Sequence, residues 1–244
     1  MKILSWNING FTKSNLPMIN DIVSSGEYGL ILFQETKSPN VPLPLATSGY
    51  KIINSPSKKP NYSGTLTATK EPPVSILRGF GDSEFDRDGR LITLEFDHFY
   101  VLNAYFPFAG DFLSNIELKL SFSRKFEQYC KELMVKKPLL ICGDFNIAHK
   151  DIDRTFGNDG MPGFSLRERE WFSSFLKLGF IDSFRFLHKD TRKYSGIWYN
   201  DRSKADRLDY CLLSAELAGF LRKSDILDNV GGSDHMPVIV ELDL

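Results

Sequence analysis

The sequence predicts an α/β fold in which two β-sheets pack face to face and are flanked by helices. Many short segments are either apolar throughout or alternate between apolar and polar residues, which is the pattern of a strand. Fewer segments, placed between them, repeat their apolar residues with the longer period of a helix. Since strands dominate and neither a repeat nor a linker interrupts the pattern, we expect one layered domain spanning residues 1–244.

The first half of the chain should supply most of the strands. Short apolar runs at 2–6 and 28–33 are typical of strands, and the helix expected at 15–25 has one apolar face, formed by Leu16, Ile19, Ile22 and Val23. Residues 38–60 are rich in Pro, Ser and Asn, which predicts a loop holding one strand at 50–54. Further strands are expected at 65–69, 74–78, 90–96 and 100–105.

The second half should contain the two longer helices. The first is expected at 116–134, before a compact apolar strand at 138–142. After a Gly/Pro loop at 158–164, Ser165 followed by Glu168 has the spacing of a capping box, which predicts a helix start. This helix should end before Gly179. The last strands are expected at 208–213 and 238–242.

Composition and charge do not by themselves indicate a nucleic-acid-binding protein. The 244 residues include 30 Lys and Arg against 31 Asp and Glu, so the formal net charge is -1 and any positive surface must be local. The three cysteines form no zinc-type spacing and no disulfide framework, which favours a reducing compartment. With neither a signal peptide nor a membrane-spanning run in view, we expect a cytoplasmic protein, nucleoid-associated in a prokaryote, with no membrane partner.

Polar residues stand where several of the expected strands end. Because strand ends in α/β folds meet on one side of the sheet, these residues are expected to converge. Carboxylates and amides with a single imidazole suit Mg²⁺ or Mn²⁺ better than zinc. The residues are Asn7, Glu35, Asp144, Asn146, Asp209, Asp234 and His235.

Each of these residues also has a purely structural interpretation. Asp144 and Asn146 could form an ordinary turn, because their side chains satisfy local backbone groups. Glu35 is harder to explain in that way, since Glu is not a favoured turn residue. Asp209 lies in an apolar strand, where a charge is costly unless it is paired, and His235 is its natural partner.

Ten short strings give the chain a clear resemblance to one family. It resembles the exonuclease III/AP endonuclease family, within the endonuclease/exonuclease/phosphatase superfamily, over nearly its whole length. WN, QE, GDFN and SDH recur throughout the superfamily, whereas NYSG, NAYFP, DSFR and RLDY point to the DNA-repair branch. The matching strings, in the family's order, are ILSWNING, FQETK, NYSG, DGRLITLEF, NAYFP, GDFN, REREWF, DSFRFL, RLDY and SDHMPV.

The resemblance implies a fold and an activity. The fold is a four-layer, DNase I-like α/β sandwich of two mixed sheets, with the active site at one end. The activity is Mg²⁺-dependent (or Mn²⁺-dependent) incision of the DNA backbone 5′ of abasic sites, with 3′-to-5′ exonuclease and 3′-end-trimming activity. The partner would be double-stranded DNA carrying abasic sites or 3′ ends, bound by a monomer.

The resemblance also implies roles for the site residues. Glu35 corresponds to the principal metal ligand, and Asp144 to the residue that orients or deprotonates the attacking water. His235, paired with Asp209, would contact the scissile phosphate. Tyr105 would also reach that phosphate or help to activate the nucleophile. The candidate metal group as a whole comprises Asn7, Glu35, Asp144, Asn146, Asp234 and His235.

The chain departs from the family's pattern where DNA should be contacted. Lys13 stands one position away from a family Arg, Phe108 replaces an Asn, and Asp111 and Asp206 replace a basic and an aromatic residue. These changes leave open the balance between abasic-site incision and exonuclease activity. Candidate DNA-binding residues are Lys37, Tyr62, Trp198, Tyr199, Arg202 and Lys204.

Two other functions remain open from sequence alone. The first is another superfamily activity, on inositol phosphates, sphingolipids or the poly(A) tail of RNA, which would use the same Glu, GDFN and SDH residues. The second is a DNA-binding module that has lost catalysis, although the acidic set is complete.

Overall fold

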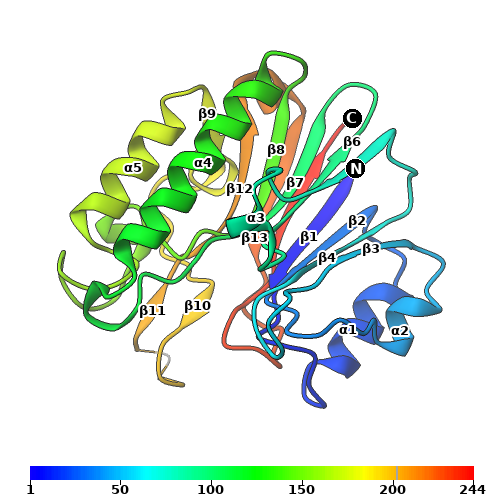
Figure 1. Ribbon diagram of the computed structural model, residues 1–244, viewed down its shortest axis with the longest axis horizontal. Helices are drawn as coiled ribbons and strands as arrows, with labels where there is room; N and C mark the ends of the chain where they lie inside the picture. The colour runs from blue at the N-terminus through cyan, green and yellow to red at the C-terminus, as the bar shows by residue number, and fades with distance from the viewer. Residues whose placement is uncertain (202) are drawn as a thin grey trace.

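Two six-stranded sheets form the centre of the computed structural model, which describes residues 1–201 and 203–244 (Figure 1). The first sheet has the strand order β13-β14-β1-β2-β4-β3. In it β1 and β2 are parallel and the other neighbours are antiparallel. Its strands are β1 (Lys2–Asn7), β2 (Leu30–Gln34), β3 (Lys51–Ser55), β4 (Thr65–Thr69), β13 (Leu221–Ile226) and β14 (Val238–Leu242).

The second sheet has the strand order β5-β6-β7-β8-β12-β9, and here only β7 and β8 are parallel. Its strands are β5 (Ser75–Arg78), β6 (Leu91–Glu95), β7 (Tyr100–Tyr105), β8 (Leu139–Asp144), β9 (Phe180–Asp182) and β12 (Asp209–Ser214). A small hairpin of β10 (Gly196–Ile197) and β11 (Ala205–Asp206) lies at the end of the molecule opposite the chain termini (Figure 1).

Helices cover the outer face of each sheet (Figure 1). The helices α4 (Ile116–Met134) and α5 (Leu166–Leu176) pack on the second sheet, and α1 (Leu16–Ser24) and α2 (Leu43–Ala46) pack on the first. The short helices α3 (Ser83–Asp86) and α6 (Ser183–Leu187) and three 3₁₀ turns (Asp111–Leu113, Asp151–Asp153 and Ala215–Phe220) complete the fold. The predicted four-layer α/β sandwich is therefore confirmed.

Alternation along the strands explains the four layers. Ile3 on β1 and Leu140 on β8 face each other's sheets in the central core, whereas their neighbours Leu4 and Ile141 pack against helices. Because successive side chains on a strand point to opposite faces, a strand that is apolar throughout is buried on both sides. Most of the expected strands have this composition, and the structure places them within one or two residues of their predicted bounds.

Some local structure was not predicted. Residues 38–60 are mostly loop and hold the expected strand, β3, but they also contain α2, in which Leu45 is fully buried. The three-residue strand β9 had no prediction either. The edge strand β13 was missed because its sequence, LRKSDI, is mostly polar and charged. Charged residues are typical of edge strands, since they prevent pairing with other chains, and this strand is specified by its partner β14 rather than by its own composition.

A network of buried hydrogen bonds around Asn103 joins the two sheets. Asn103 on β7 donates hydrogen bonds to backbone oxygens of Phe33 and Leu66, at 3.2 and 3.0 Å, and to the hydroxyl of Thr67 at 3.1 Å. It also accepts a 2.8 Å hydrogen bond from the side chain of Gln34. Asn103 and Gln34 are fully buried, so the cost of their burial is offset only while these bonds are made.

Replacing Asn103 by alanine should therefore destabilise the protein by about 2–4 kcal/mol, because buried polar groups lose their partners. The free energy of unfolding, measured with urea, tests this. The matched control is Asn40→Ala, whose exposed side chain has no hydrogen bond within the described residues, and which should change stability by less than about 0.5 kcal/mol. Equal stability of the two variants would show that the network does not hold the sheets together.

No helix within the described residues has the length and apolar character needed to cross a membrane.

Candidate active site

The candidate active site lies where strand ends from both sheets meet. Strand register brings its groups together: Asp209, the first residue of β12, pairs with Asp144, the last residue of β8. Tyr105 at the end of β7 also lies next to Asp144 in the parallel pair. The first sheet contributes Asn7 from the end of β1 and Glu35 from the residue after β2. Residues distant in sequence thus become neighbours.

A cavity of about 240 Å³ at this end is lined by all the predicted catalytic and metal-binding residues except Asp209. Asp209 does not line it, but lies directly behind His235. The lining residues are Asn7, Glu35, Tyr105, Phe108, Asp144, Asn146, Gly196, Ile197, Trp198, Leu208, Asp234 and His235.

A larger cavity, of about 770 Å³, lies near the two termini and has a different character. Its wall is mainly apolar, with Phe96, Phe99 and Phe220, and its charged groups are exposed carboxylates at the rim, such as Asp97. The buried carboxylates and the imidazole are in the smaller cavity, which is therefore the better candidate for chemistry.

The backbone around the site is held in uncommon conformations. Asn9, Glu35 and Asn146 have φ values of 49°, 55° and 52°, in the left-handed region that costs energy for residues with a side chain. Gly143 is required for a different reason. A Cβ at this residue would lie 1.9 Å from the backbone oxygen of Ala104, so only glycine allows β7 and β8 to approach as they do.

Asp144 is fully buried and held by three donated hydrogen bonds. The side-chain amide of Asn7 donates to it at 2.8 Å, and Asn146 donates from its backbone N–H at 2.7 Å and from its side chain at 3.1 Å. Burial, together with the nearby Asp209 carboxylate, raises the pKa of Asp144 to about 7, although His235 and Asn7 oppose the shift. A carboxyl group with this pKa can exchange a proton near neutral pH.

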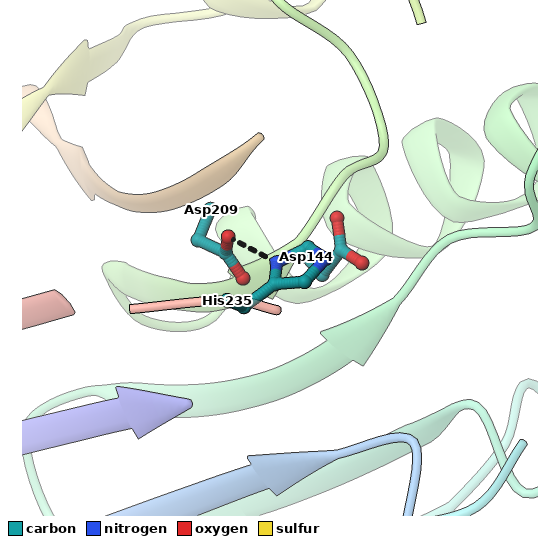
Figure 2. A group of neighbouring side chains, drawn as sticks. All are labelled: Asp144, Asp209 and His235. Carbon is teal, nitrogen blue, oxygen red and sulfur yellow. Dashed lines mark hydrogen bonds and ion pairs between the residues drawn. The ribbon is translucent and has the colours of Figure 1, made fainter. Parts of the chain in front are cut away.

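His235 lies between two carboxyl groups, as Figure 2 shows. The pairing with Asp209 expected from the sequence is present, at 2.7 Å between Nδ1 and the carboxylate oxygen. Burial alone would lower the pKa of His235, but Asp209 and Asp144 outweigh it and raise the pKa well above its usual value. The ring therefore carries a positive charge at neutral pH and directs Nε2 away from Asp209.

Glu35 is positioned to attract a cation. Its carboxylate lies 3.0 Å from the ammonium group of Lys37, which also donates to the side chain of Asn9. The amide of Asn9 in turn donates to Asp234 at 3.1 Å. Lys37, expected to bind DNA, thus points into the carboxylate side of the site in this structure.

Tyr105 remains a hydrogen-bond donor rather than a base. Burial, followed in importance by the charge of Glu35, raises the pKa of Tyr105 well above its usual value. The guanidinium group of Arg90 lies 4.9 Å from the centre of this ring and 5.4 Å from that of Tyr62, and it donates to the Tyr62 hydroxyl at 2.8 Å.

The remaining candidates for DNA contact lie around the cavity. Trp198 lines it, and its indole N–H donates to Asp206 at 2.8 Å while the ring packs 5.8 Å from that of Phe108. Tyr199 is 74% exposed and lines a neighbouring hollow that shares Asp234 with the cavity, where a base or sugar could stack. Lys204 lies 3.5 Å from an Asp201 oxygen. Arg202 lies outside the described residues.

The sequence did not single out Asn9 or Arg90 as site residues. Asn9 resembles an ordinary turn residue, and only the fold brings it between Lys37 and Asp234. Arg90 stands in the matching string DGRLITLEF, and that string was the only available signal.

Known proteins resemble this chain over nearly its full length. The model of the endonuclease/exonuclease/phosphatase family matches residues 4–235. An exodeoxyribonuclease of Bacillus subtilis is 35% identical over 246 residues, covering 98% of each protein. The DNA repair nuclease APEX1 of Danio rerio is 36% identical over 254 residues, covering 99% of this chain and 82% of the relative. A solved AP endonuclease from Archaeoglobus fulgidus has the same fold, with a TM-score of 0.88 at 24% identity and full coverage of both chains.

The pairing of Asp209 with His235 makes a direct prediction. In Asp209→Asn the pKa of His235 should fall, because the carboxylate that most favours the charged ring is gone while burial still opposes the charge. A titration of the histidine ring signals by NMR measures this shift. An unchanged His235 signal would refute the electrostatic role of Asp209.

Proposed function

We propose that this chain, which belongs to the endonuclease/exonuclease/phosphatase family and within it to the exonuclease III/AP endonuclease group, is a metal-dependent DNA-repair nuclease. Its reaction is hydrolysis of the DNA backbone 5′ of an abasic site, with 3′-to-5′ exonuclease and 3′-end trimming as further activities. The observation that carries the proposal is the convergence of Glu35, Asp144 and His235 from both sheets on one cavity. The full-length relatives support DNA as the substrate.

The donor set at the cavity fits a hard divalent cation, Mg²⁺ or Mn²⁺, because it consists of carboxylate and amide oxygens. Two positions are possible. Asp144, Asp209 and His235 can bring one ligand atom each to within 4.8 Å of one another, but Nδ1 of His235 is already hydrogen-bonded to Asp209. A cation at that position would compete with this bond, so we place the cation at Glu35, with Asn7 and Asp234 beside it.

A cation held there would stabilise the negative charge that builds up on the phosphate oxygens. Asp144 is proposed to orient the attacking water and accept its proton, and three donated hydrogen bonds fix its carboxylate for this task. Asn7 and Asn146 therefore act on Asp144 as well as being candidates for the metal group.

The phosphate is proposed to bind between His235 and Tyr105. His235 offers a positive charge and an Nε2–H donor that Asp209 orients from behind. Tyr105 offers a hydroxyl that keeps its proton at neutral pH. Donors fixed before the reaction stabilise developing charge without reorganising, and each is worth ~10²-fold or more in rate.

A basic groove next to the site suits the DNA backbone. Lys58, Lys59 and Tyr62 line it together with Lys37, and the Lys59 ammonium lies 4.6 Å from the centre of the Tyr62 ring. Lysines beside an aromatic ring can follow phosphates and stack on a base or sugar. The groove is a local positive surface on a chain whose formal net charge is only -1, so DNA binding does not require a basic protein overall. Trp198, Tyr199 and Lys204, and Arg202 by sequence, are proposed to contact the DNA on the other side of the cavity.

The two other functions are less well supported. A phosphodiesterase that acts on inositol phosphates or sphingolipids, or an RNA deadenylase, would use the same carboxylates, but relatives that match along the chain are named for DNA. A module without catalysis would have no reason to keep a buried carboxyl group with a pKa of about 7 beside a charged His235. We further propose a monomer that works in the cytoplasm, on the nucleoid if the source is prokaryotic; the buried, unpaired cysteines fit a reducing compartment.

The activity is tested with Mg²⁺ and a DNA duplex that carries one abasic-site analogue. We expect a single nick immediately 5′ of the analogue, and a loss of ~10²-fold or more in kcat for Asp144→Ala and for His235→Ala. The melting temperature of Asp144→Ala should change little, because the variant removes a charge whose burial is unfavourable.

The control variant is Asp97→Ala, an exposed carboxylate at the opposite end that should leave nicking unchanged. Turnover of lipid phosphates without nicking would reject the DNA-repair function. Full nicking by Asp144→Ala and His235→Ala would reject the assignment of the site.

A further inference from the structure

A buried ion pair between α4 and α5 lies close to the site. Lys119 on α4 and Glu168 on α5 are both fully buried, and Lys119 Nζ lies 2.7 Å from the Glu168 carboxylate. Burial lowers the pKa of Lys119 from its usual value, and Glu168 opposes this shift. A buried pair is often no more stabilising than apolar residues of similar size, so stability alone does not explain it.

Glu168 has a structural role of its own. It accepts hydrogen bonds from the backbone of Gly163 at 3.2 Å and of Ser165 at 3.1 Å, and from the Ser165 hydroxyl at 2.6 Å. It thus completes the capping box at the start of α5. None of these bonds needs Lys119, and a glutamine could make most of them.

Lys119 has a second contact, and this one leads to the site. Its ammonium group donates to the backbone oxygen of Asn146. Asn146 has a left-handed backbone with φ of 52°, and its side chain donates to the backbone of Phe106 at 3.0 Å and to Asp144 at 3.1 Å. Its backbone N–H donates to Asp144 as well. The bond from Lys119 holds the Asn146 carbonyl and so helps to fix the left-handed backbone of this residue. A change in that backbone conformation would shift the Asn146 N–H and side chain, which are two of the three donors that hold Asp144.

We infer that Lys119 is a positioning residue of the active site: held by Glu168, it fixes the backbone conformation of Asn146 and through it the orientation of Asp144. The inference rests on the proposed function of Asp144. Lys119 does not reach the cavity itself, so it should affect the reaction step and not the binding of DNA.

The test uses a variant that removes the whole pair. Lys119→Met alone would leave Glu168 buried and unpaired, which can prevent folding. We therefore combine Lys119→Met with Glu168→Gln, which removes both charges and keeps a side chain that can cap α5. With an abasic-site duplex and Mg²⁺, kcat should fall by about 10–100-fold while KM stays within about threefold, because the base is misplaced but the DNA groove is intact.

Two further measurements separate positioning from support of the fold. The single variant Lys119→Arg keeps a hydrogen-bond donor and a positive charge opposite Glu168. Its kcat should therefore lie much closer to the wild-type value than the kcat of the double variant does. In an Asn146→Ala background, the paired substitution should lower kcat much less than it does in the wild type, because both act through the same turn. Lys131→Met is the matched control, since Lys131 lies on the same helix but is exposed and pairs only with Glu127 within the described residues.

The outcomes are distinct. Three results would assign the pair to structure and overturn the inference. They are a folded double variant with wild-type kcat, a double variant whose kcat/KM falls through a higher KM alone, and a double variant that does not fold. If the wild-type protein itself does not nick DNA in the same assay, the proposed function fails instead.

Discussion

The charged His235 ring between two buried carboxyl groups is the interaction on which the rest of the site depends. Pairing of β8 with β12 sets Asp144 opposite Asp209, and two carboxylates this close cannot both be ionised at low cost. The imidazolium, bonded to Asp209 at 2.7 Å, offsets that repulsion. The pKa of Asp144 is then about 7. The same three side chains thus supply a positively charged imidazole ring that can bind a phosphate and a carboxyl group that can act as a base.

Other parts of the fold support this arrangement, both next to the three side chains and further from them. Gly143 lets β7 and β8 approach closely, and the left-handed backbones of Glu35 and Asn146 direct their side chains into the cavity. Further away, the Asn103 network holds the two sheets together, and each sheet carries half of the site. Strained backbone and buried polar groups reduce stability, and proteins tolerate them mainly at functional sites. Their concentration at one end of an otherwise well-packed sandwich therefore marks that end as the functional site.

The sequence was sufficient for the parts that depend on local pattern. Alternation and apolar runs predicted the strands of both sheets except β9 and β13, and the polar residues that follow several of those strands predicted the cavity. The partner of Asp209 was predictable because a lone charge in an apolar strand must be paired. Register was not predictable, so the opposition of Asp144 and Asp209 and the contact between Lys37 and Glu35 emerge only in three dimensions. Lys119 escaped notice for the same reason, because in sequence a lysine on an amphipathic helix resembles a solvated surface residue.

The position of the cation tests the central claim most directly, because a His235 ring that stays hydrogen-bonded to Asp209 leaves Glu35 to bind the metal. The measurement is a crystal structure soaked in Mn²⁺, with the ion located by its anomalous scattering. The account predicts an ion coordinated by the Glu35 carboxylate, with the Asp209–His235 hydrogen bond unchanged. An ion coordinated by Asp144, Asp209 and His235 would contradict it.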